Sequence, residues 1–250
     1  MKIGIIGFGD LGRSLISGLI KGGINKEDVL VYDVAGRRTG KAGNMGLTVC
    51  EDADTLVKQS RRVIFAIPKK AFDEMEMDWS AFDDKTVFSC MAEVKMAALK
   101  QRFGGRVVRV IPTLAAENGV SIVGICFDEN VENTEEIKNM FRKVGTVIQC
   151  EENELSTITA LAACGLCYAA YILNSFINTA ENLGFDYDRG KEIVEKTFKA
   201  AMEMGDYELL IGKIAGRGGI TIKGVDVMNE GNVHKTIDTA FKTAYGAFLK

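Results

Sequence analysis

Six residues near the start of the chain, Gly7-Phe8-Gly9-Asp10-Leu11-Gly12, have the spacing with which a backbone can bind the pyrophosphate of a dinucleotide. Gly7 would permit a tight turn, Gly9 would let the backbone approach the phosphates, and Gly12 would let a helix pack closely on the preceding strand. The anion would then lie at the free N–H groups of that helix. The spacing alone is weak in a chain with 27 glycines, so its sequence context decides.

The flanking residues supply that context. The apolar run Ile3–Ile6 is typical of a buried strand, and apolar residues recur at helical spacing over Leu11–Leu19. Together they predict the strand, turn and helix of a dinucleotide-binding domain.

An acidic residue and two basic residues follow the second predicted strand. Asp33 lies about twenty residues after the glycine turn, where such folds place the carboxylate that binds the adenosine ribose. Arg37 and Arg38 come next, and their guanidinium groups could pair with the additional phosphate of NADP or lie in a solvated loop. The residues therefore predict a nicotinamide cofactor, with NADP favoured and NAD still open.

The first 150 residues alternate short β-branched runs with amphipathic segments, which is typical of β-α-β units and a parallel sheet. After Glu152 the apolar residues recur with the helical period instead. We predict an α/β Rossmann-type domain with a parallel sheet at residues 1–151 and an all-α domain at 152–250. The predicted strands are Lys2–Gly7, Val29–Asp33, Val63–Ala66, Thr86–Cys90, Val107–Ile111 and Ser121–Cys126, and the predicted helices are Asn153–Gly184, Asp188–Met204, Tyr207–Ile214, Gly219–Asn229 and Gly231–Leu249.

Composition excludes several classes of partner. A net charge of −3 gives no basic field for nucleic acid. The first residues lack the three-part pattern of a signal peptide, so we expect a cytoplasmic location. No charged residue lies between Glu154 and Glu181, but the polar side chains and the Ala-Ala-Cys-Gly centre of this stretch favour a helix buried on all sides in an oligomer over a membrane span.

The six cysteines lie mostly in apolar segments, which favours buried free thiols over disulfides. Cys164-Gly165-Leu166-Cys167 is a lone C-x-x-C without a second cysteine pair, and we expect buried packing there and no metal site. His234 is the single histidine and has no partner at ligand spacing, so a solvated position is expected.

Blocks of sequence along nearly the whole chain resemble the pyrroline-5-carboxylate reductase family, whose members reduce a cyclic imine to proline. The glycine turn is the first block. Ser89–Leu99 with Val108–Pro112 resembles the family's later strand regions, and Thr159–Tyr168 is similar to its Thr-Ala-Leu-Ser-Gly-Ser-Gly-Pro-Ala-Tyr. Gly216–Thr221, followed by Glu230-Gly231, is similar to its Ser-Pro-Gly-Gly-Thr-Thr and later Glu-x-Gly.

The resemblance implies a substrate site at the start of a helix. Gly218, Gly219 and Ile220 would bind a carboxylate through backbone N–H groups, and Cys164 stands at a substrate-side serine position. Thr221 matches the threonine whose hydroxyl approaches the substrate nitrogen, although a hydroxyl here could also cap the helix. On the cofactor side, Ala66, Pro68 and Pro112 would border the nicotinamide, and a cofactor role for Lys69 or Lys70 is left open.

The family's activity is then the leading hypothesis. It implies an NAD(P)H-dependent oxidoreductase that reduces the C=N bond of a small carboxylate-bearing cyclic imine, with pyrroline-5-carboxylate to proline first, and the helical domain as the interface of a homodimer or assembly of dimers. The substrate-side blocks depart from the family at Ala162-Ala163-Cys164 and Gly216-Arg217. Two alternatives therefore stay open: an NADP-dependent oxidoreductase with another substrate, including a deazaflavin, and a non-catalytic dinucleotide-binding descendant.

Overall fold

A computed structural model describes residues 2–248 of the chain. The chain folds into two compact units, of which the first reaches Ala163 and the second is Cys164–Ala247. The domain boundary expected from the sequence, between residues 151 and 152, coincides with the start of a helix that belongs to the first unit.

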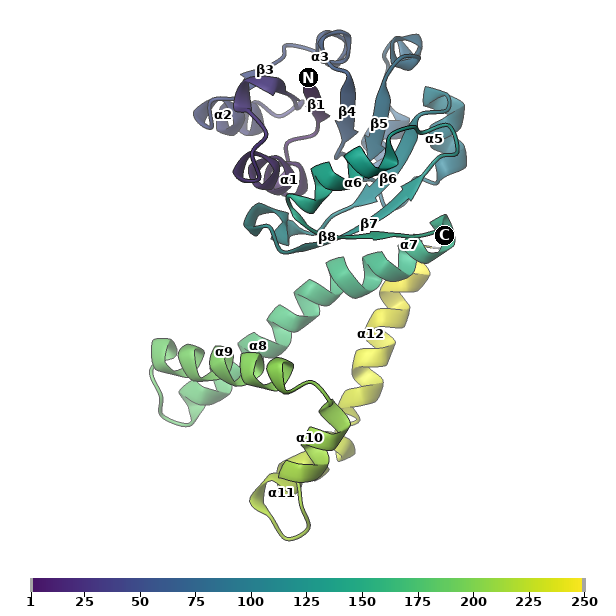
Figure 1. Cartoon of the computed structure of the whole chain (residues 1–250). Coiled ribbons are helices and arrows are strands. Elements are labelled where there is room, and N and C mark those ends of the chain that lie inside the picture. The colour runs from purple at the N-terminus through teal and green to yellow at the C-terminus, as the bar shows by residue number, and fades with distance from the viewer. Residues whose placement is uncertain (1, 249–250) are drawn as a thin grey trace. The chain divides into compact units, whose positions relative to one another are not determined.

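The first unit contains an eight-stranded sheet in the order β3-β2-β1-β4-β5-β6-β7-β8 (Figure 1). Neighbouring strands are parallel except β6 and β7, so the predicted parallel sheet is correct apart from this pair. The strands are β1 (Ile3–Ile6), β2 (Val29–Tyr32), β3 (Thr48–Val49), β4 (Arg62–Phe65), β5 (Thr86–Ser89), β6 (Val107–Ile111), β7 (Ser121–Phe127) and β8 (Gly145–Gln149).

Two of these strands, β3 and β8, were not predicted. Both lie at the edges of the sheet. β3 has only two residues, and the residues of β8 are at least partly exposed, so neither shows the buried β-branched run that identifies an inner strand.

Helices surround the sheet and make up the second unit. In the first unit they are α1 (Asp10–Lys21), α2 (Gly36–Asn44), α3 (Ala53–Gln59), α4 (Lys69–Asp73), α5 (Met96–Phe103), α6 (Thr134–Arg142) and α7 (Glu152–Thr159), with short 3-10 turns η1 (Lys26–Asp28), η2 (Trp79–Phe82) and η3 (Leu114–Asn118). The second unit holds α8 (Gly165–Asn182), α9 (Tyr187–Met204), α10 (Tyr207–Ile214), α11 (Ile220–Glu230) and α12 (Val233–Phe248) up to Ala247. The expected all-helical second half is thus confirmed, and Leu249 of the last predicted helix lies outside the described residues.

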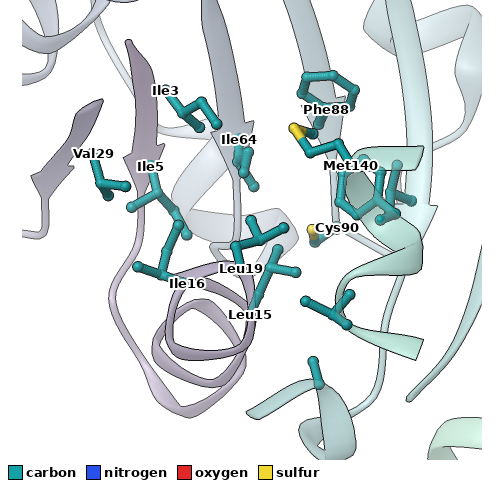
Figure 2. Close-up of a cluster of buried hydrophobic side chains, with 14 of the residues drawn as sticks. Ile3, Ile5, Leu15, Ile16, Leu19, Val29, Ile64, Phe88, Cys90 and Met140 are labelled. Carbon is teal, nitrogen blue, oxygen red and sulfur yellow. The ribbon is translucent and has the colours of Figure 1, made fainter. Parts of the chain in front are cut away.

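One face of the sheet is covered by α1 and α6. Figure 2 shows Leu15 and Leu19 of α1 and Met140 of α6 packed toward side chains of the strands, among them Ile5 and Ile64. Each such fully buried apolar side chain stabilises the fold by about 1.5–3 kcal/mol. The helical spacing of the α1 apolar residues therefore fixes the helix that follows the glycine turn against the sheet.

The opposite face is covered by α3, α5 and the turn η2. Its core is aromatic: the rings of Phe65, Phe72, Phe82, Phe103 and Trp79 have centroids 4.9–5.9 Å apart. Edge-on and tilted ring contacts of this kind stabilise beyond the area that they bury.

Helix α7 also packs on the sheet, at Gly124 of β7. A Cβ atom at this position would lie 2.8 Å from Leu155 Cδ1 and 3.1 Å from Ile158 Cγ2. Only glycine leaves room for such close contact, so Gly124 holds the start of α7 directly against β7.

The helices of the second unit pack on each other through few contacts. Phe176 of α8 meets Phe198 of α9 at 5.0 Å between ring centroids, and Tyr168 of α8 meets Phe241 of α12 at the same distance. The hydroxyl of Tyr168 also donates to Ala240 O. Most other apolar side chains of this unit are exposed; they include Leu166, Tyr171, Leu183, Ile193, Ile211, Ile214, Ile220 and Val227.

The charge-free stretch is therefore not buried on all sides within one chain, because Ile177 is the sole buried residue of α8. The run Glu152–Asn182 is long and apolar enough to cross a membrane by length and composition. A helix in the core of a soluble protein passes the same test, so this finding is weak evidence for a span.

Candidate active site

The glycine turn at the end of β1 has the geometry that its sequence predicts. Gly7 has φ of 99°, and a Cβ atom there would lie 2.4 Å from Ala66 O. A Cβ atom at Gly12 would lie 2.1 Å from Gly7 O. Both glycines are therefore required by the fold itself, which brings the first turn of α1 against the preceding strand.

Gly9 differs from the other two glycines of the turn, Gly7 and Gly12. The nearest atoms to a Cβ placed there are Cζ and Nη2 of Arg38, at 3.8 and 3.9 Å, which is ordinary van der Waals contact. Nothing in the protein therefore demands glycine at this position. A pyrophosphate lying against the backbone would demand it, so the space at Gly9 fits the group that the turn is expected to bind.

Asp33 ties the end of β2 to this turn. Its Oδ2 accepts the backbone N–H of Phe8 at 2.7 Å, and its Oδ1 accepts the N–H of Ala35 at 2.8 Å. Arg38 Nη1 lies 3.4 Å from Oδ2. The buried carboxylate therefore orients the glycine turn and also holds Arg38 beside Gly9.

The two arginines lie in the first turn of α2, not in the loop that the sequence suggested. Both are exposed, and the side chain of Arg38 keeps 47% of its surface accessible. Arg37 forms no ion pair with any residue of the described chain, so its charge is free for a ligand. Asp10, the exposed first residue of α1, lies 3.7 Å from Arg13, which offsets its negative charge.

The loops after β4 and β6 lie at the same edge of the sheet, where the carboxyl ends of parallel strands meet. Ala66 donates its N–H to Ile6 O and borders Gly7. Pro68 caps α4, and Pro112 is buried directly after β6. A role for these three residues beside the nicotinamide stays a prediction.

The two lysines after Pro68 are engaged with carboxylates of the same short segment. Lys69 is paired with Asp73, and Lys70 lies 3.9 Å from Glu74. Both pairs are exposed, so they are worth little to stability and leave a cofactor role for either lysine without structural support.

One pair of residues was missed by the sequence reasoning. Arg109 of β6 has a side chain only 4% exposed, and its Nη1 lies 2.7 Å from Oε1 of Glu152 at the start of α7. The available signal was the charge itself, because an arginine within Val-Val-Arg-Val-Ile interrupts a strand that is otherwise fully apolar.

In the second unit, the turn before α11 contains two glycines. Gly218 has φ of 80°, and Gly219 is the N-cap residue without a side-chain cap. The N–H groups of the first helical turn are therefore open to a ligand. Thr221 is exposed in this turn, and its hydroxyl makes no hydrogen bond within the described part of the chain, so the capping alternative finds no support.

Cys164 lies far along the chain from this turn, at the end of a π-helical segment, Ala160–Cys164, that precedes α8. It is half-buried, and burial raises the pKa of its thiol. Among residues 2–248 no hydrogen bond or ion pair joins Cys164 to the Gly218–Thr221 turn, and a substrate role for Cys164 stays a prediction.

The remaining cysteines and the histidine have no site geometry. No group of three or more His, Cys, Asp or Glu that could hold a metal ion occurs between residues 2 and 248. His234 is exposed on α12. The expectation of buried cysteines is right for Cys50, Cys90 and Cys126, holds partly for Cys150 and Cys164, and is wrong within one chain for the exposed Cys167.

Two family models match the chain. One, described as pyrroline-5-carboxylate reductase dimerisation, matches residues 152–248. The other, described as NADP oxidoreductase coenzyme F420-dependent, matches residues 2–93. The first model covers the helical part of the chain, and the second covers the strands β1 to β5 with the glycine turn between β1 and α1.

Relatives extend the match to nearly the whole chain. Pyrroline-5-carboxylate reductase of Aquifex aeolicus (strain VF5) is 25% identical over 247 residues, which cover 95% of this chain and 92% of the relative. Pyrroline-5-carboxylate reductase 2 of Bacillus subtilis (strain 168) is 23% identical, with 94% of this chain and 90% of the relative covered.

Solved structures share the fold. The structure of Plasmodium falciparum pyrroline carboxylate reductase with NADP bound has a TM-score of 0.88 and 21% identity, covering 99% of this chain and 97% of that one. The 1-pyrroline-5-carboxylate reductase of Streptococcus pyogenes has a TM-score of 0.88 and 20% identity, covering 99% and 98%. Together with the dimerisation model and the relatives of similar length, these matches show that the chain is similar to pyrroline-5-carboxylate reductases over nearly its whole length.

Proposed function

We propose that the protein is an NADPH-dependent reductase of a small carboxylate-bearing cyclic imine, and that it converts pyrroline-5-carboxylate to proline. The observation that carries the assignment of the cofactor is the open space at Gly9. No packing contact within the protein requires glycine there, whereas a bound pyrophosphate would. The match of residues 152–248 to the dimerisation model and the relatives named for this reaction support the substrate half.

The cofactor would be held at the carboxyl edge of the sheet. The pyrophosphate would be bound by the backbone N–H groups of residues 9–12, because those of Gly7 and Phe8 already donate to Tyr32 O and Asp33, and Asp33 would keep this turn in place. Arg38, fixed beside Gly9, and Arg37 would bind the phosphate that distinguishes NADP from NAD. NADP is therefore favoured, in agreement with the NADP-bound relative and the NADP oxidoreductase model, and NAD remains a possible second cofactor.

The nicotinamide would lie toward Ala66, Pro68 and Pro112, at the ends of β4 and β6. When bound, NADPH supplies the hydride, and the protein contributes alignment and electrostatic stabilisation.

The substrate carboxylate would be bound by the uncapped start of α11. The N–H groups of Gly218 and Ile220 would donate to it, and Gly219, whose own N–H donates to Gly216 O at 3.1 Å, would line the site as the N-cap residue. The helix N-terminus would add about 0.3–1 kcal/mol, or about 2 kcal/mol if the site is partly buried. Thr221 would then place its hydroxyl near the imine nitrogen, where it could relay the proton that this nitrogen takes up as the carbon takes up hydride. Cys164 would be a further substrate contact.

We propose that the protein acts as a soluble cytoplasmic homodimer or assembly of dimers. Many apolar side chains of α8 to α11 are exposed in the single chain, and soluble monomers rarely expose large contiguous apolar patches. A second copy of the same chain would cover these side chains, in agreement with the dimerisation model on residues 152–248. No role for nucleic acid or membrane is proposed.

One observation favours a second candidate, hydride exchange between NADP and a deazaflavin. The model matched by residues 2–93 is described as coenzyme F420-dependent. The glycine turn would serve that reaction equally well, whereas the helix start at Gly219 would have no small carboxylate to bind. A third candidate, a dinucleotide-binding protein without activity, is motivated by the replacement of the family's Ser-Pro by Gly216-Arg217.

The deciding experiment follows the oxidation of NADPH and of NADH with pyrroline-5-carboxylate, and separately with oxidised deazaflavin. We expect oxidation of NADPH with the imine, a loss of kcat of at least about tenfold in Thr221→Ala, and near-normal kcat in Thr221→Ser, which keeps the hydroxyl. Oxidation only with the deazaflavin would establish the second candidate. Binding of NADPH without oxidation in either assay would establish the third.

A further inference from the structure

Arg109 is a buried cation in the middle of a strand. Its side chain is 4% exposed, and its neighbours in β6 are apolar and fully buried. Burying a guanidinium costs several kcal/mol unless charged and polar groups compensate it. Burying Arg109 therefore costs free energy that apolar packing alone does not offset, so its hydrogen-bond partners must account for its presence in the strand.

Its partners lie on two other segments of the first unit. Nη1 lies 2.7 Å from Oε1 of Glu152, the first residue of α7. Nη2 donates to Ala92 O at 2.7 Å and lies 3.5 Å from Met91 O. The Glu152 oxygen that meets Arg109 also accepts the backbone N–H of Met96 at 2.6 Å. One ion pair thus joins β6, α7 and both ends of the loop between β5 and α5.

The loop between β5 and α5 lies at the carboxyl edge of the sheet. It leaves β5 after Ser89 and enters α5 at Met96, so it runs over the carboxyl edge of the sheet next to the loops of β4 and β6. In a sheet whose strand order reverses between β1 and β4, this is the nicotinamide half of the cleft. The carbonyl of Ala92 is held by Arg109, and the N–H of Met96 is held by Glu152.

The hydrogen bonds of Arg109 are incomplete in one respect. Its Nε atom is the single buried side-chain N or O atom without a partner in the part of the chain that the structure describes. A buried donor left unpaired costs free energy, so the orientation of this guanidinium satisfies the loop carbonyls while its Nε–H stays unpaired. The guanidinium is thus oriented to hold the loop carbonyls of Met91 and Ala92.

We infer that Arg109 and Glu152 are positioning residues for hydride transfer, because they hold the β5–α5 loop in the shape that receives the nicotinamide ring. The inference rests on the proposed function. Neither side chain touches the cofactor or substrate in this account; both act through the backbone of residues 91–96. A misplacement of about 1 Å at such a loop can cost about 100-fold in rate.

The test uses a matched pair of glutamates. Glu136, like Glu152, lies in the first turn of a helix in the first unit and pairs with a largely buried arginine, Arg62, at 2.6 Å. That pair lies at the amino ends of the strands, away from the carboxyl edge where the cofactor would bind, because Arg62 is the first residue of β4. Glu152→Ala is compared with Glu136→Ala, and Glu152→Gln provides a milder variant that keeps an acceptor for Met96.

The readouts are kcat, the isotope effect on kcat with 4-deuterated NADPH, and the Kd of NADPH. We expect both Glu152 variants to lower kcat, Glu152→Ala by at least about tenfold, and to raise the isotope effect, with the Kd of NADPH changed by less than about threefold. Glu136→Ala should leave kcat and the isotope effect at their wild-type values. Wild-type kcat and isotope effect in both Glu152 variants, or equal losses at both glutamates, would overturn the inference.

Amide hydrogen exchange separates this inference from the proposed reaction. NADPH should slow the exchange of residues 91–96 in the wild type and in Glu136→Ala, and should slow it less in Glu152→Ala. Equal protection in all three proteins would overturn the positioning role even if the enzyme reduces pyrroline-5-carboxylate. Absence of turnover in the wild type would count against the proposed reaction and would leave the exchange result to decide the role of the pair.

Discussion

The carboxylate of Asp33 accepts the backbone N–H of Phe8 at 2.7 Å, which joins the end of β2 to the glycine turn after β1. The same carboxylate lies 3.4 Å from Arg38, whose guanidinium borders Gly9. Asp33 therefore orients two groups that a dinucleotide would meet, the turn for its pyrophosphate and the arginine for its additional phosphate.

Gly9→Ala should separate cofactor binding from folding. A Cβ at Gly9 meets only the end of Arg38 at ordinary distance, so thermal stability should stay close to that of the wild type. The Kd of NADPH should rise by at least about tenfold, since the methyl group occupies the space of the phosphate. Gly12→Ala is the control: its Cβ would lie 2.1 Å from Gly7 O, and it should lose about 1–3 kcal/mol or fail to fold. Unchanged NADPH binding in a folded Gly9→Ala protein would contradict the site.

Arg38→Ala should weaken NADPH more than NADH. Hydrogen bonds to a charged group contribute about 1.5–3 kcal/mol, so we expect the Kd of NADPH to rise about 10- to 100-fold and that of NADH to change by less than about threefold. Calorimetric titration with each cofactor measures both. The control is Arg13→Ala, an arginine engaged with Asp10 and Glu117. Equal weakening of both cofactors by Arg38→Ala would mean that Arg38 binds no 2′-phosphate.

Asp128 should stabilise the fold in a pH-dependent way. Burial opposes its ionised form, but hydrogen bonds from Lys100 at 2.5 Å and from the N–H of Asn130 outweigh this, so its pKa lies below the ordinary 3.8. A lowered folded-state pKa stabilises above the unfolded-state value, and the contribution is lost as pH falls through the folded-state value. Asp128→Asn should therefore cost about 1–3 kcal/mol at pH 7 and progressively less below pH 3.8.

Urea unfolding at several pH values measures this difference. Glu129→Gln is the control, because Glu129 pairs with the same Lys100 at 3.1 Å but is 80% exposed and should contribute little. A stability difference for Asp128→Asn that persists undiminished well below pH 3.8 would contradict the assigned ion pair.

The cysteines should differ widely in reactivity. Cys167 is exposed within one chain, whereas burial raises the pKa of Cys90 to about 12 and that of Cys150, half-buried beside β7, to about 11. Thiols react as thiolates, so a maleimide at pH 8 should label Cys167 first and Cys90 only on unfolding. Mass spectrometry of the labelled peptides measures the order. If assembly covers α8, labelling of Cys167 should slow as protein concentration rises, and rapid labelling of Cys90 in the native state would contradict the packing.

Much of the cofactor half could be predicted from the sequence because it depends on local patterns. The spacing Gly7–Gly12 and the position of Asp33 are read along the chain, and both fall where the fold requires them. The strand β8 was missed because its residues are partly or fully exposed at a sheet edge. The placement of Arg37 and Arg38 in a helix was missed because α2 holds three glycines and few apolar residues.

The pair Arg109 and Glu152 could not be predicted, since the two are separated by 43 residues and meet only through tertiary structure. The burial of α8 was predicted within an oligomer, and one protomer does not test it. In the single chain Ile177 is the sole buried residue of this helix. The apolar pattern of α8 would be explained if a partner subunit covers it.

Transfer of label is the most direct test of the central claim. NADPH deuterated at the transferable C4 position is incubated with the protein and pyrroline-5-carboxylate, and the proline is examined by mass spectrometry. The account predicts proline that carries one deuterium on C5, formed in step with NADPH oxidation and strongly diminished in Thr221→Ala. Unlabelled proline, or bound NADPH that is never oxidised in the presence of the imine, would contradict it.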